Sequence, residues 1–207
     1  MRIKSLLIMI ALLCGFSVQA QESALLQTFT QELHLKNTKV STIQCDFTQT
    51  RSASVLANDV VKRGRFYFVK PGNTLLAFNG GDYIKITEEW FEMKTGGNVS
   101  KMKVAVNPML KNLNSLLSAC MVGDFEQMSR GFEIRLESST KEWVVVMVPV
   151  RGKSVSKVSQ IELRFDRSNM SLNSLKMEEK TGDYTLYVFS NKSFNKEIDS
   201  KMFNIVQ

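Results

Sequence analysis

The sequence predicts a mainly β protein of the α+β class, built from a single curled antiparallel sheet. Short segments of alternating apolar and polar residues follow one another along most of the chain, and turn residues separate them, as in an antiparallel meander. A sheet of roughly ten strands must curl, close or be covered. The two amphipathic helices that we expect are too few to coat a flat sheet, but they are enough for a curled one. We therefore expect an unclosed half-barrel with helices lying across its open side.

Residues 1–20 have the pattern of a secretory signal peptide. Arg2 and Lys4 precede an apolar run over residues 6–16, and a small-x-small end closes at Ala20. The apolar run is too short to span a bilayer. We expect cleavage after Ala20 and export of the remaining chain.

The remaining chain, residues 21–207, has the length expected of a single domain with a core of its own. The full chain has 27 Lys and Arg against 20 Asp and Glu, and these charges are interspersed without a dense basic block. A nucleic-acid partner therefore fits the sequence poorly. A mildly basic surface suits an acidic partner, anionic headgroups or solubility alone.

The three cysteines leave two alternatives open. Cys14 lies inside the leader, where an acylated anchor would require a small preceding residue rather than Leu13. Cys45 and Cys120 remain after cleavage, and an exported pair can form a disulfide. Two buried free thiols are the other alternative, because the sequence shows neither connectivity nor geometry. A Cys45–Cys120 disulfide would tether the second expected helix to the first expected strand.

The first two elements follow from a change in hydrophobic period. Apolar residues at helical spacing predict an amphipathic helix over residues 22–35, with its apolar side formed by Leu25, Leu26, Phe29 and Leu33. Residues 40–51 then alternate, which predicts a strand with one apolar face: Ile43, Cys45 and Phe47. Residues 52–59 are small and polar, and we expect a loop.

Residues 64–78, GRFYFVKPGNTLLAF, predict a hairpin that is apolar on both faces. Alternation places Phe66, Phe68 and Lys70 on one face, and residues 71–73 supply turn chemistry before the chain returns. A strand that is apolar on both sides is either covered twice or lines a cavity. We interpret this hairpin as a cavity wall.

The rest of the chain predicts more strands around a second helix. We expect strands over residues 82–87, 90–94, 101–106, 132–137, 143–150, 158–166, 171–179 and 184–190. Asn107 and Pro108 are suited to the start of the second helix and Gly123 to its end. Its apolar residues recur at helical spacing: Met109, Leu110, Leu113, Leu116, Leu117 and Cys120. A last turn over residues 199–205 is expected to pack Met202 and Phe203 on the sheet.

Motifs for covalent chemistry are missing from the sequence. His34 is the single histidine, and no group of His, Cys, Asp and Glu has metal-ligand spacing. There is no G-x-S-x-G elbow and no glycine-rich phosphate loop. Adjacent glutamates such as Glu88 and Glu89 point to opposite faces of a strand and do not form a carboxylate pair. We expect no catalytic residue, no metal and no cofactor, and hence not an enzyme.

The order of motifs resembles the LolA family of periplasmic lipoprotein carriers. The motifs are V-S-T-x-x-x-x-F-T-Q at residues 40–49, G-R-F-Y-F-V-K-P at 64–71, the helix at 108–121, I-E-L-x-F-D at 161–166 and G-D-Y-T-L-Y-x-F-x-N…N…I-D-x-x-x-F at 182–203. Together they cover essentially the whole exported chain. The sequence looks most similar to the versions found in Bacteroidetes-type bacteria.

The resemblance implies a fold and a function. Members have an unclosed β-barrel with a helical lid over an apolar cavity, use no cofactor and catalyse no covalent step. They take acylated lipoproteins from an ATP-driven release complex in the inner membrane and carry them across the periplasm to the outer membrane or an acceptor there. We expect the same of this chain, acting as a monomer. A carrier or sensor of another amphiphile, such as a glycolipid or pigment lipid, is the alternative.

The resemblance also assigns residues to the expected site. The acyl-chain cavity is expected to be lined by Phe47, Phe66, Phe68, Leu76 and Phe78. The lid residues that fill this groove when it is empty are expected to be Leu26, Phe29, Leu113, Leu116 and Leu117. Lys70 stands where the best-known members have an arginine tied to lid closure and release, so we expect it to control the lid from the rim.

Overall fold

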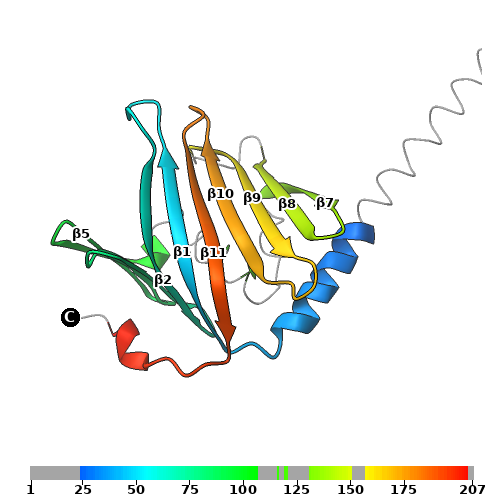
Figure 1. Ribbon diagram of the computed structural model, residues 1–207, viewed down its shortest axis with the longest axis horizontal. Helices are drawn as coiled ribbons and strands as arrows, with labels where there is room; N and C mark the ends of the chain where they lie inside the picture. Colours follow the sequence, from blue (N-terminus) through cyan, green and yellow to red (C-terminus); the bar gives the residue numbers. More distant parts are fainter. Residues whose placement is uncertain (1–23, 107–115, 117–118, 121–130, 151–156, 205–207) are drawn as a thin grey trace, which may run out of the picture.

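The computed structural model describes residues 24–106, 116, 119–120, 131–150 and 157–204, shown in Figure 1. The described residues contain a helix over residues 24–37, here called the N-terminal helix, and one antiparallel sheet. The strands of this sheet are β1 (Thr42–Ser52), β2 (Val60–Val69), β3 (Asn73–Phe78), β4 (Tyr83–Ile86), β5 (Trp90–Thr95), β6 (Asn98–Lys103), β7 (Phe132–Ser138), β8 (Glu142–Pro149), β9 (Val158–Asp166), β10 (Leu172–Glu179) and β11 (Tyr184–Phe194). The 3₁₀ turns η1 (Val104–Val106) and η2 (Ser200–Phe203) complete the described elements.

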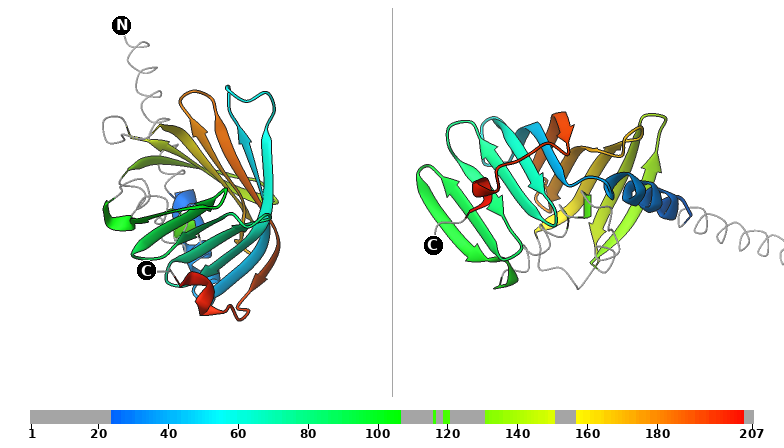
Figure 2. Two further views of the ribbon diagram at one scale, coloured as in Figure 1. Left: turned by 90° about the vertical axis from the view of Figure 1, so that its left-hand side faces the viewer. Right: turned by 90° about the horizontal axis from the view of Figure 1, so that it is seen from below.

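The sheet consists of two meanders joined through β1 and β11. Within the described residues it has 11 strands in the order β6-β5-β4-β3-β2-β1-β11-β10-β9-β8-β7. β6 and β7 are the two ends of this order, so the sheet is not closed. Figure 2 shows the strands curving around, with the N-terminal helix beside the half formed by β7, β8 and β9. This architecture confirms the unclosed antiparallel sheet that the strand pattern predicted.

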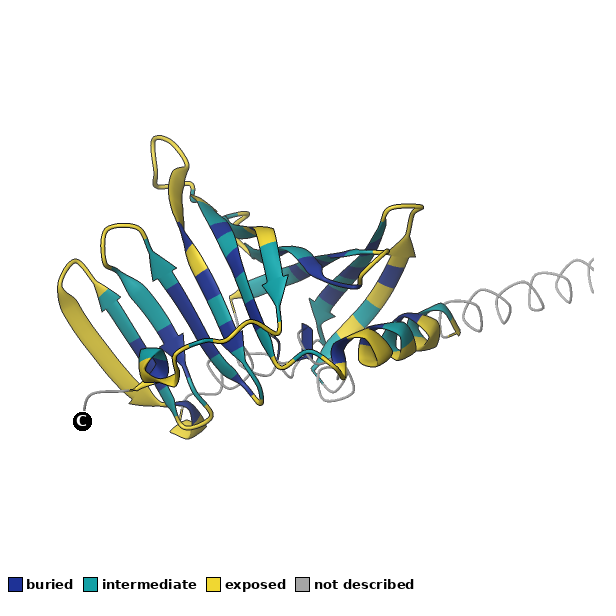
Figure 3. Ribbon diagram, turned by 60° about the horizontal axis from the view of Figure 1, so that its bottom comes forward, coloured by how far each residue is buried: buried dark blue, intermediate teal, exposed yellow. Residues whose placement is uncertain are grey.

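The alternation predicted for the first strand is present in β1. Ile43, Cys45 and Phe47 are buried, whereas the intervening side chains are only partly covered, a pattern visible along the strands in Figure 3. In the register with β2, Cys45 lies opposite Phe66 and Phe47 lies opposite Gly64. The apolar side chains of the two strands therefore share one face of the sheet.

Gly64 is required at its position in β2. A Cβ atom there would lie 2.1 Å from the carbonyl oxygen of Ala77 and 2.9 Å from the ring of Phe47. Phe47 on β1 and Phe78 on β3 flank this glycine, and their rings meet edge to face with centroids 5.1 Å apart. The missing side chain therefore lets two aromatic rings touch across an intervening strand.

Several boundaries differ from those expected. β2 begins at Val60 rather than residue 64, because it stays paired with β1 as far as Arg51. The strand expected over residues 101–106 is instead β6 followed by η1. β11 continues to Phe194 because it pairs with β1 beyond an irregularity between Gln44 and Asp46. Pairing partners, rather than local alternation, set these ends.

The lid of several helices lies largely outside the described residues. The N-terminal helix is present as expected, with Phe29 and Leu33 fully buried. Most of the second expected helix, including Leu113 and Leu117, falls in residues that the structure does not describe. The expected leader, residues 1–20, also lies outside them.

A cluster of buried apolar residues covers the concave face of the sheet from β5 to β7. Apolar residues of neighbouring strands lie directly opposite each other on this face. Examples are the pairs Phe66 and Leu76, Leu175 and Tyr187, and Val145 and Leu163. The cluster includes residues of nearly every strand together with Phe29 and Leu33 of the N-terminal helix. The main core of the described residues therefore lies on the concave side of the sheet, where the N-terminal helix packs against it.

The hairpin formed by β2 and β3 is covered on its convex face as well. Leu75 and Phe203 are buried but lie apart from the main cluster, and η2 packs against β3. At the C-terminal end of η2, the Lys85 Nζ donates to the carbonyl oxygen of Asn204 over 2.7 Å. The same Nζ lies 3.4 Å from the Glu92 carboxylate. The interpretation of the hairpin as a cavity wall alone is thus corrected, because one face joins the interior and the other lies under the C-terminal segment.

Candidate functional site

The five residues expected to line an acyl-chain cavity lie together on the concave face. Phe47, Phe66, Phe68 and Leu76 are buried, and Phe78 is partly buried against the same cluster. Phe66 opposes Leu76 in the register of β2 and β3. The edge-to-face contact of Phe47 with Phe78 joins the first three strands into one apolar wall. Strand alternation is what places these side chains on a common face.

The wall continues onto β11, whose residues the sequence did not assign to the expected cavity. The ring of Phe189 on β11 meets Phe66 edge to face at 5.3 Å, and Tyr187 lies 6.2 Å from Phe47. Gln49 Nε2 donates to the Tyr187 hydroxyl over 2.6 Å, and burial raises the pKa of Tyr187. Alternation in residues 184–190 indicates that these two aromatic residues share a face of one strand. Only the pairing of β1 with β11 shows that they extend the same wall.

The N-terminal helix enters the interior on the other half of the sheet. The Phe29 ring packs edge to face on Trp143 of β8, with centroids 5.7 Å apart, and on Phe165 of β9 at 5.3 Å. Leu26 on the same helix is partly buried against the cluster. Among the described residues, the aromatic contacts of Phe29 lie on β8 and β9 rather than on the β2–β3 hairpin.

Leu116 is the other lid residue that the structure describes. It is buried together with Ala119 and Cys120, and all three belong to the same core cluster as the sheet residues. Side chains from the helix expected after Asn107 thus contribute to the interior.

Lys70 joins the β2–β3 hairpin to the N-terminal helix. Its Nζ donates to the carbonyl oxygen of Asn37 over 2.8 Å and to that of Thr38 over 3.2 Å. The last carbonyl groups of a helix have no partner within the helix and carry its negative partial charge. The Asn37 carbonyl also accepts from the Val40 N–H, so the ammonium adds a charged donor that stabilises this helix end. The rim position expected for Lys70 is thus a contact with the end of a helix.

A small cavity lies where the helix end, β1, β2 and β11 meet. Its volume is about 20 Å³, which is roughly the room that a single water molecule needs. It is lined by Asn37, Ile43, Cys45, Phe66, Cys120, Met170, Ser171, Leu172, Phe189, Lys192 and Phe194. An acyl chain does not fit into this volume, so a chain bound at this point would have to displace side chains that line the cavity.

Cys45 and Cys120 both line this cavity, and both are free thiols. The disulfide considered for this pair is therefore absent from the structure. Burial raises the pKa of Cys45 to about 12 and raises that of Cys120 as well. Disulfide exchange requires the thiolate, and burial keeps both groups in the thiol form. The alternative of two buried free thiols is the one that the structure has.

Polar groups inside the cluster are few. The Thr74 hydroxyl and Trp143 Nε1 are buried without a hydrogen-bond partner in the described structure. Among the described residues no group of three or more His, Cys, Asp and Glu is placed to hold a metal ion. His34 is exposed on the outer side of the N-terminal helix. The described interior is therefore suited to an apolar ligand.

Comparison of the sequence with protein families gives a match over residues 38–206 to the family described as "Outer membrane lipoprotein carrier protein LolA". The chain belongs to this family. No curated protein matches the sequence. No helix of the described residues is long and apolar enough to cross a membrane.

Solved structures with a TM-score above 0.5 share this fold at low sequence identity. An uncharacterised conserved protein from Thermus thermophilus aligns with a TM-score of 0.52 and 11% identity, covering 86% of this chain and 94% of its own. MucB aligns with a TM-score of 0.51 and 12% identity, covering 88% of this chain and 63% of its own. A LolA superfamily protein from Nitrosomonas europaea aligns with a TM-score of 0.45 and 12% identity, covering 85% of this chain and 97% of its own.

Proposed function

We propose that this LolA-family protein is a periplasmic carrier that binds the acyl chains of lipoproteins released from the inner membrane and delivers them to the outer membrane. The observation that carries the proposal is the apolar concave face, which a separate helix fills with Phe29 and Leu33. Because this helix is not part of the sheet, it can move away from the concave face without breaking strand pairing. In this proposal residues 1–20 direct export, and residues 21–207 act as one carrier domain without a cofactor.

Loading exchanges one set of apolar contacts for another. Each methylene group moved out of water gains about 0.8 kcal/mol, and three fully buried acyl chains would exceed the practical limit of about 18 to 21 kcal/mol for noncovalent binding. In the empty protein Phe29 and Leu33 occupy the interior, and a ligand must displace them. Net affinity is therefore modest, and the load can be handed to an acceptor.

The acyl chains lie against the aromatic wall of β1, β2 and β3. We propose Phe47, Phe66, Phe68, Leu76 and Phe78 as its contacts. Phe29, Leu26 and the leucines of the second helix, Leu113, Leu116 and Leu117, are the side chains that return when the ligand leaves. Lys70 controls this exchange, because it holds the C-terminal end of the N-terminal helix.

Depletion of the protein from its own cells tests the proposal. Lipoproteins are expected to accumulate in the inner membrane, and a plasmid copy of the wild-type chain is expected to restore their sorting. Protein co-expressed with the release complex is expected to purify with bound lipoprotein. Normal sorting after depletion, together with no lipoprotein on the purified protein, would contradict the proposal.

A carrier or sensor of another amphiphile is the second candidate. The apolar concave face supports this candidate as well, because apolar contacts are non-directional and do not distinguish the acyl chains of a lipoprotein from those of another amphiphile. Free lipid bound to the purified chain, with no lipoprotein even after co-expression with the release complex, would favour this candidate.

A further inference from the structure

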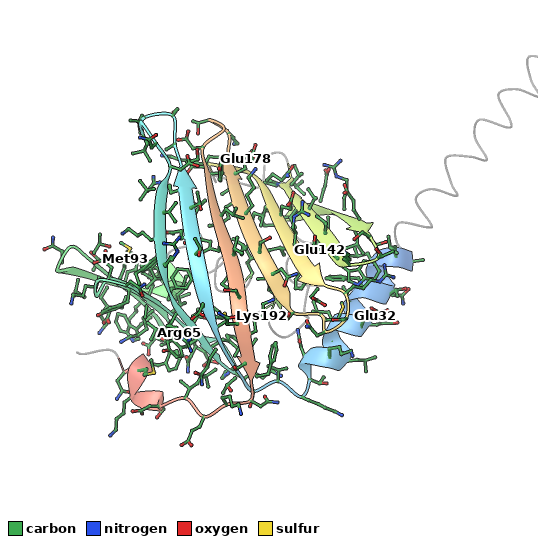
Figure 4. The ribbon with its side chains drawn as sticks, in the orientation of Figure 1. Glu32, Arg65, Met93, Glu142, Glu178 and Lys192 are labelled. Atoms are coloured by element: carbon green, nitrogen blue, oxygen red, sulfur yellow. The ribbon has the colours of Figure 1, made fainter. Side chains whose placement is uncertain are left out.

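Lys192 is a partly buried lysine that lines the apolar cavity. It lies on β11, and its side chain lines the cavity beside Phe66, Phe189 and Cys45; Figure 4 shows its place on the strand. Burial lowers its pKa, and the nearby Asp166 and Cys45 oppose that shift. A cation at the end of an apolar face needs an explanation, because burying a charge without a partner is unfavourable.

The Lys192 ammonium has hydrogen bonds but no ion pair with a described carboxylate. Its Nζ donates to the Ser171 hydroxyl over 2.9 Å and to Asn173 Oδ1 over 2.5 Å. The Asp166 carboxylate accepts instead from Ser168 and Asn169. An ammonium group carries three donors, and the third has no partner among the described residues. The ammonium of this cavity-lining lysine therefore has one donor without a described partner.

The surroundings restrict what this donor can bind. The cavity of about 20 Å³ has room for roughly one small oxygen-bearing group. Its other lining includes Leu172, Phe189 and Phe194, which continue into the apolar cluster. Near neutral pH the two cysteines remain protonated, because burial raises their pKa, so they give the ammonium no anionic partner. A ligand that fits has a polar oxygen joined directly to long apolar chains.

We propose that Lys192 binds an acyl carbonyl oxygen at the polar head of the ligand, and so orients its chains along the concave face. This inference rests on the proposed carrier function and deepens it. The oxygen comes either from the ester groups of a lipoprotein anchor or from the carboxylate of a free fatty acid. Ser171 and Asn173 act as positioning residues, because they hold the ammonium through its other donors.

Binding measurements on the full exported chain test this inference. The probes are a dipalmitoyl lipopeptide with ester-linked chains, its ether-linked analogue without carbonyl groups, and palmitate. Because a hydrogen bond to a charged group contributes about 1.5 kcal/mol or more, wild type is expected to bind the ester probe about tenfold more tightly than the ether probe. Lys192→Met is expected to bind both probes with the affinity that wild type has for the ether probe.

Two further variants serve as controls. Lys192→Arg keeps a charged donor and is expected to retain the preference for the ester. Lys196→Met removes an exposed lysine near the same strand and is expected to change neither affinity. The ether probe reports on folding, because a misfolded Lys192→Met protein would lose it too. Palmitate bound more tightly than the ester probe, and weakened in Lys192→Met, would identify a carboxylate as the source of the oxygen.

The results that contradict each proposal differ. If wild type and Lys192→Met bind the ester probe equally well, or if wild type binds ester and ether alike, Lys192 does not bind the carbonyl oxygen and carriage itself stands. If wild type binds none of the three probes, the acyl-carrier function fails, and the role of Lys192 fails with it.

Discussion

Lys70 Nζ lies 2.8 Å from the carbonyl oxygen of Asn37, and this hydrogen bond joins the β2–β3 hairpin to the end of the N-terminal helix. Asn37 is also buried and lines the cavity that contains Cys45, Cys120 and Lys192. The lysine on the hairpin therefore contacts the residue at which the helix meets the interior. We therefore expect a substitution at Lys70 to alter the packing of this helix end first.

Replacing Lys70 with methionine should loosen the N-terminal helix. The helix loses a cationic partner for its last carbonyl groups, so the free energy of unfolding should fall by about 1 kcal/mol. Relative to wild type, amide hydrogen exchange should speed up more in residues 24–37 than in β9 and β10. Acyl ligand should also dissociate at a different rate.

Two variants control the Lys70 experiment. Lys70→Arg keeps the cation and should behave nearly as wild type. Lys39→Met removes an exposed lysine close to the same helix end and should leave exchange unchanged. Unaltered exchange in Lys70→Met would show that the hydrogen bond does not hold the helix.

Replacing Phe29 with alanine should destabilise the empty protein and favour ligand. Phe29 is fully buried between Trp143 and Phe165, and loss of such a ring costs about 3 kcal/mol or more. Urea unfolding measures this change. Because the ring no longer competes for the interior, affinity for a palmitoylated lipopeptide should rise at the same time.

Leu35 provides a matched control on the same helix. It is 69% exposed, so Leu35→Ala should change the free energy of unfolding by less than about 0.5 kcal/mol. Equal destabilisation by Phe29→Ala and Leu35→Ala would contradict the placement of Phe29 in the interior.

Replacing Gly64 with alanine should disrupt the aromatic wall. The new Cβ would lie 2.1 Å from the Ala77 carbonyl oxygen, so β2 and β3 must separate or shift. We expect a loss of about 2 kcal/mol or more in the free energy of unfolding, and weaker ligand binding because Phe47 and Phe78 move apart. Gly131→Ala is the control, since a Cβ there meets nothing within 4 Å. A Gly64→Ala protein as stable as the control would rule out this close approach.

The buried thiols should make stability fall at high pH. Burial raises the pKa of Cys45 from its ordinary value of 9.0 to about 12. Between these values the folded protein keeps the proton that the unfolded chain releases, so stability decreases as pH rises, by roughly 1.4 kcal/mol per pH unit for one thiol. Denaturant unfolding between pH 8 and 11 should therefore show a steeper loss for wild type than for Cys45→Ala.

Thiol reagents give a second measurement on the same groups. Near neutral pH the folded protein should react slowly at Cys45 and Cys120, whereas protein unfolded without reductant should react fully at both. An unreactive pair in the unfolded, unreduced chain would instead indicate a disulfide.

Much of the fold follows from local patterns that the sequence carries. Alternation in residues 40–51 placed Ile43, Cys45 and Phe47 on one face, and the Pro71–Gly72 turn placed the β2–β3 hairpin. The expected turn near Phe203 is present as η2. These predictions succeed because strand period and turn chemistry depend on neighbouring residues.

Tertiary structure decided the parts of the site that depend on distant partners. Pairing of β1 with β11 brings Phe189 to Phe66, and packing sets Phe29 on Trp143 and Phe165. Nothing local marks Lys192 as a residue that lines the cavity, because its orientation follows from the path of β11 beside β1.

The sequence by itself determined that this chain has strands with an apolar face and an amphipathic helix to cover them. Only the tertiary structure decided where the helix sits, that its end is held by Lys70, and that Cys45 and Cys120 stay apart as thiols around one cavity. The physical reason is range: hydrophobic period is written in adjacent residues, whereas packing and burial depend on which faces meet in space.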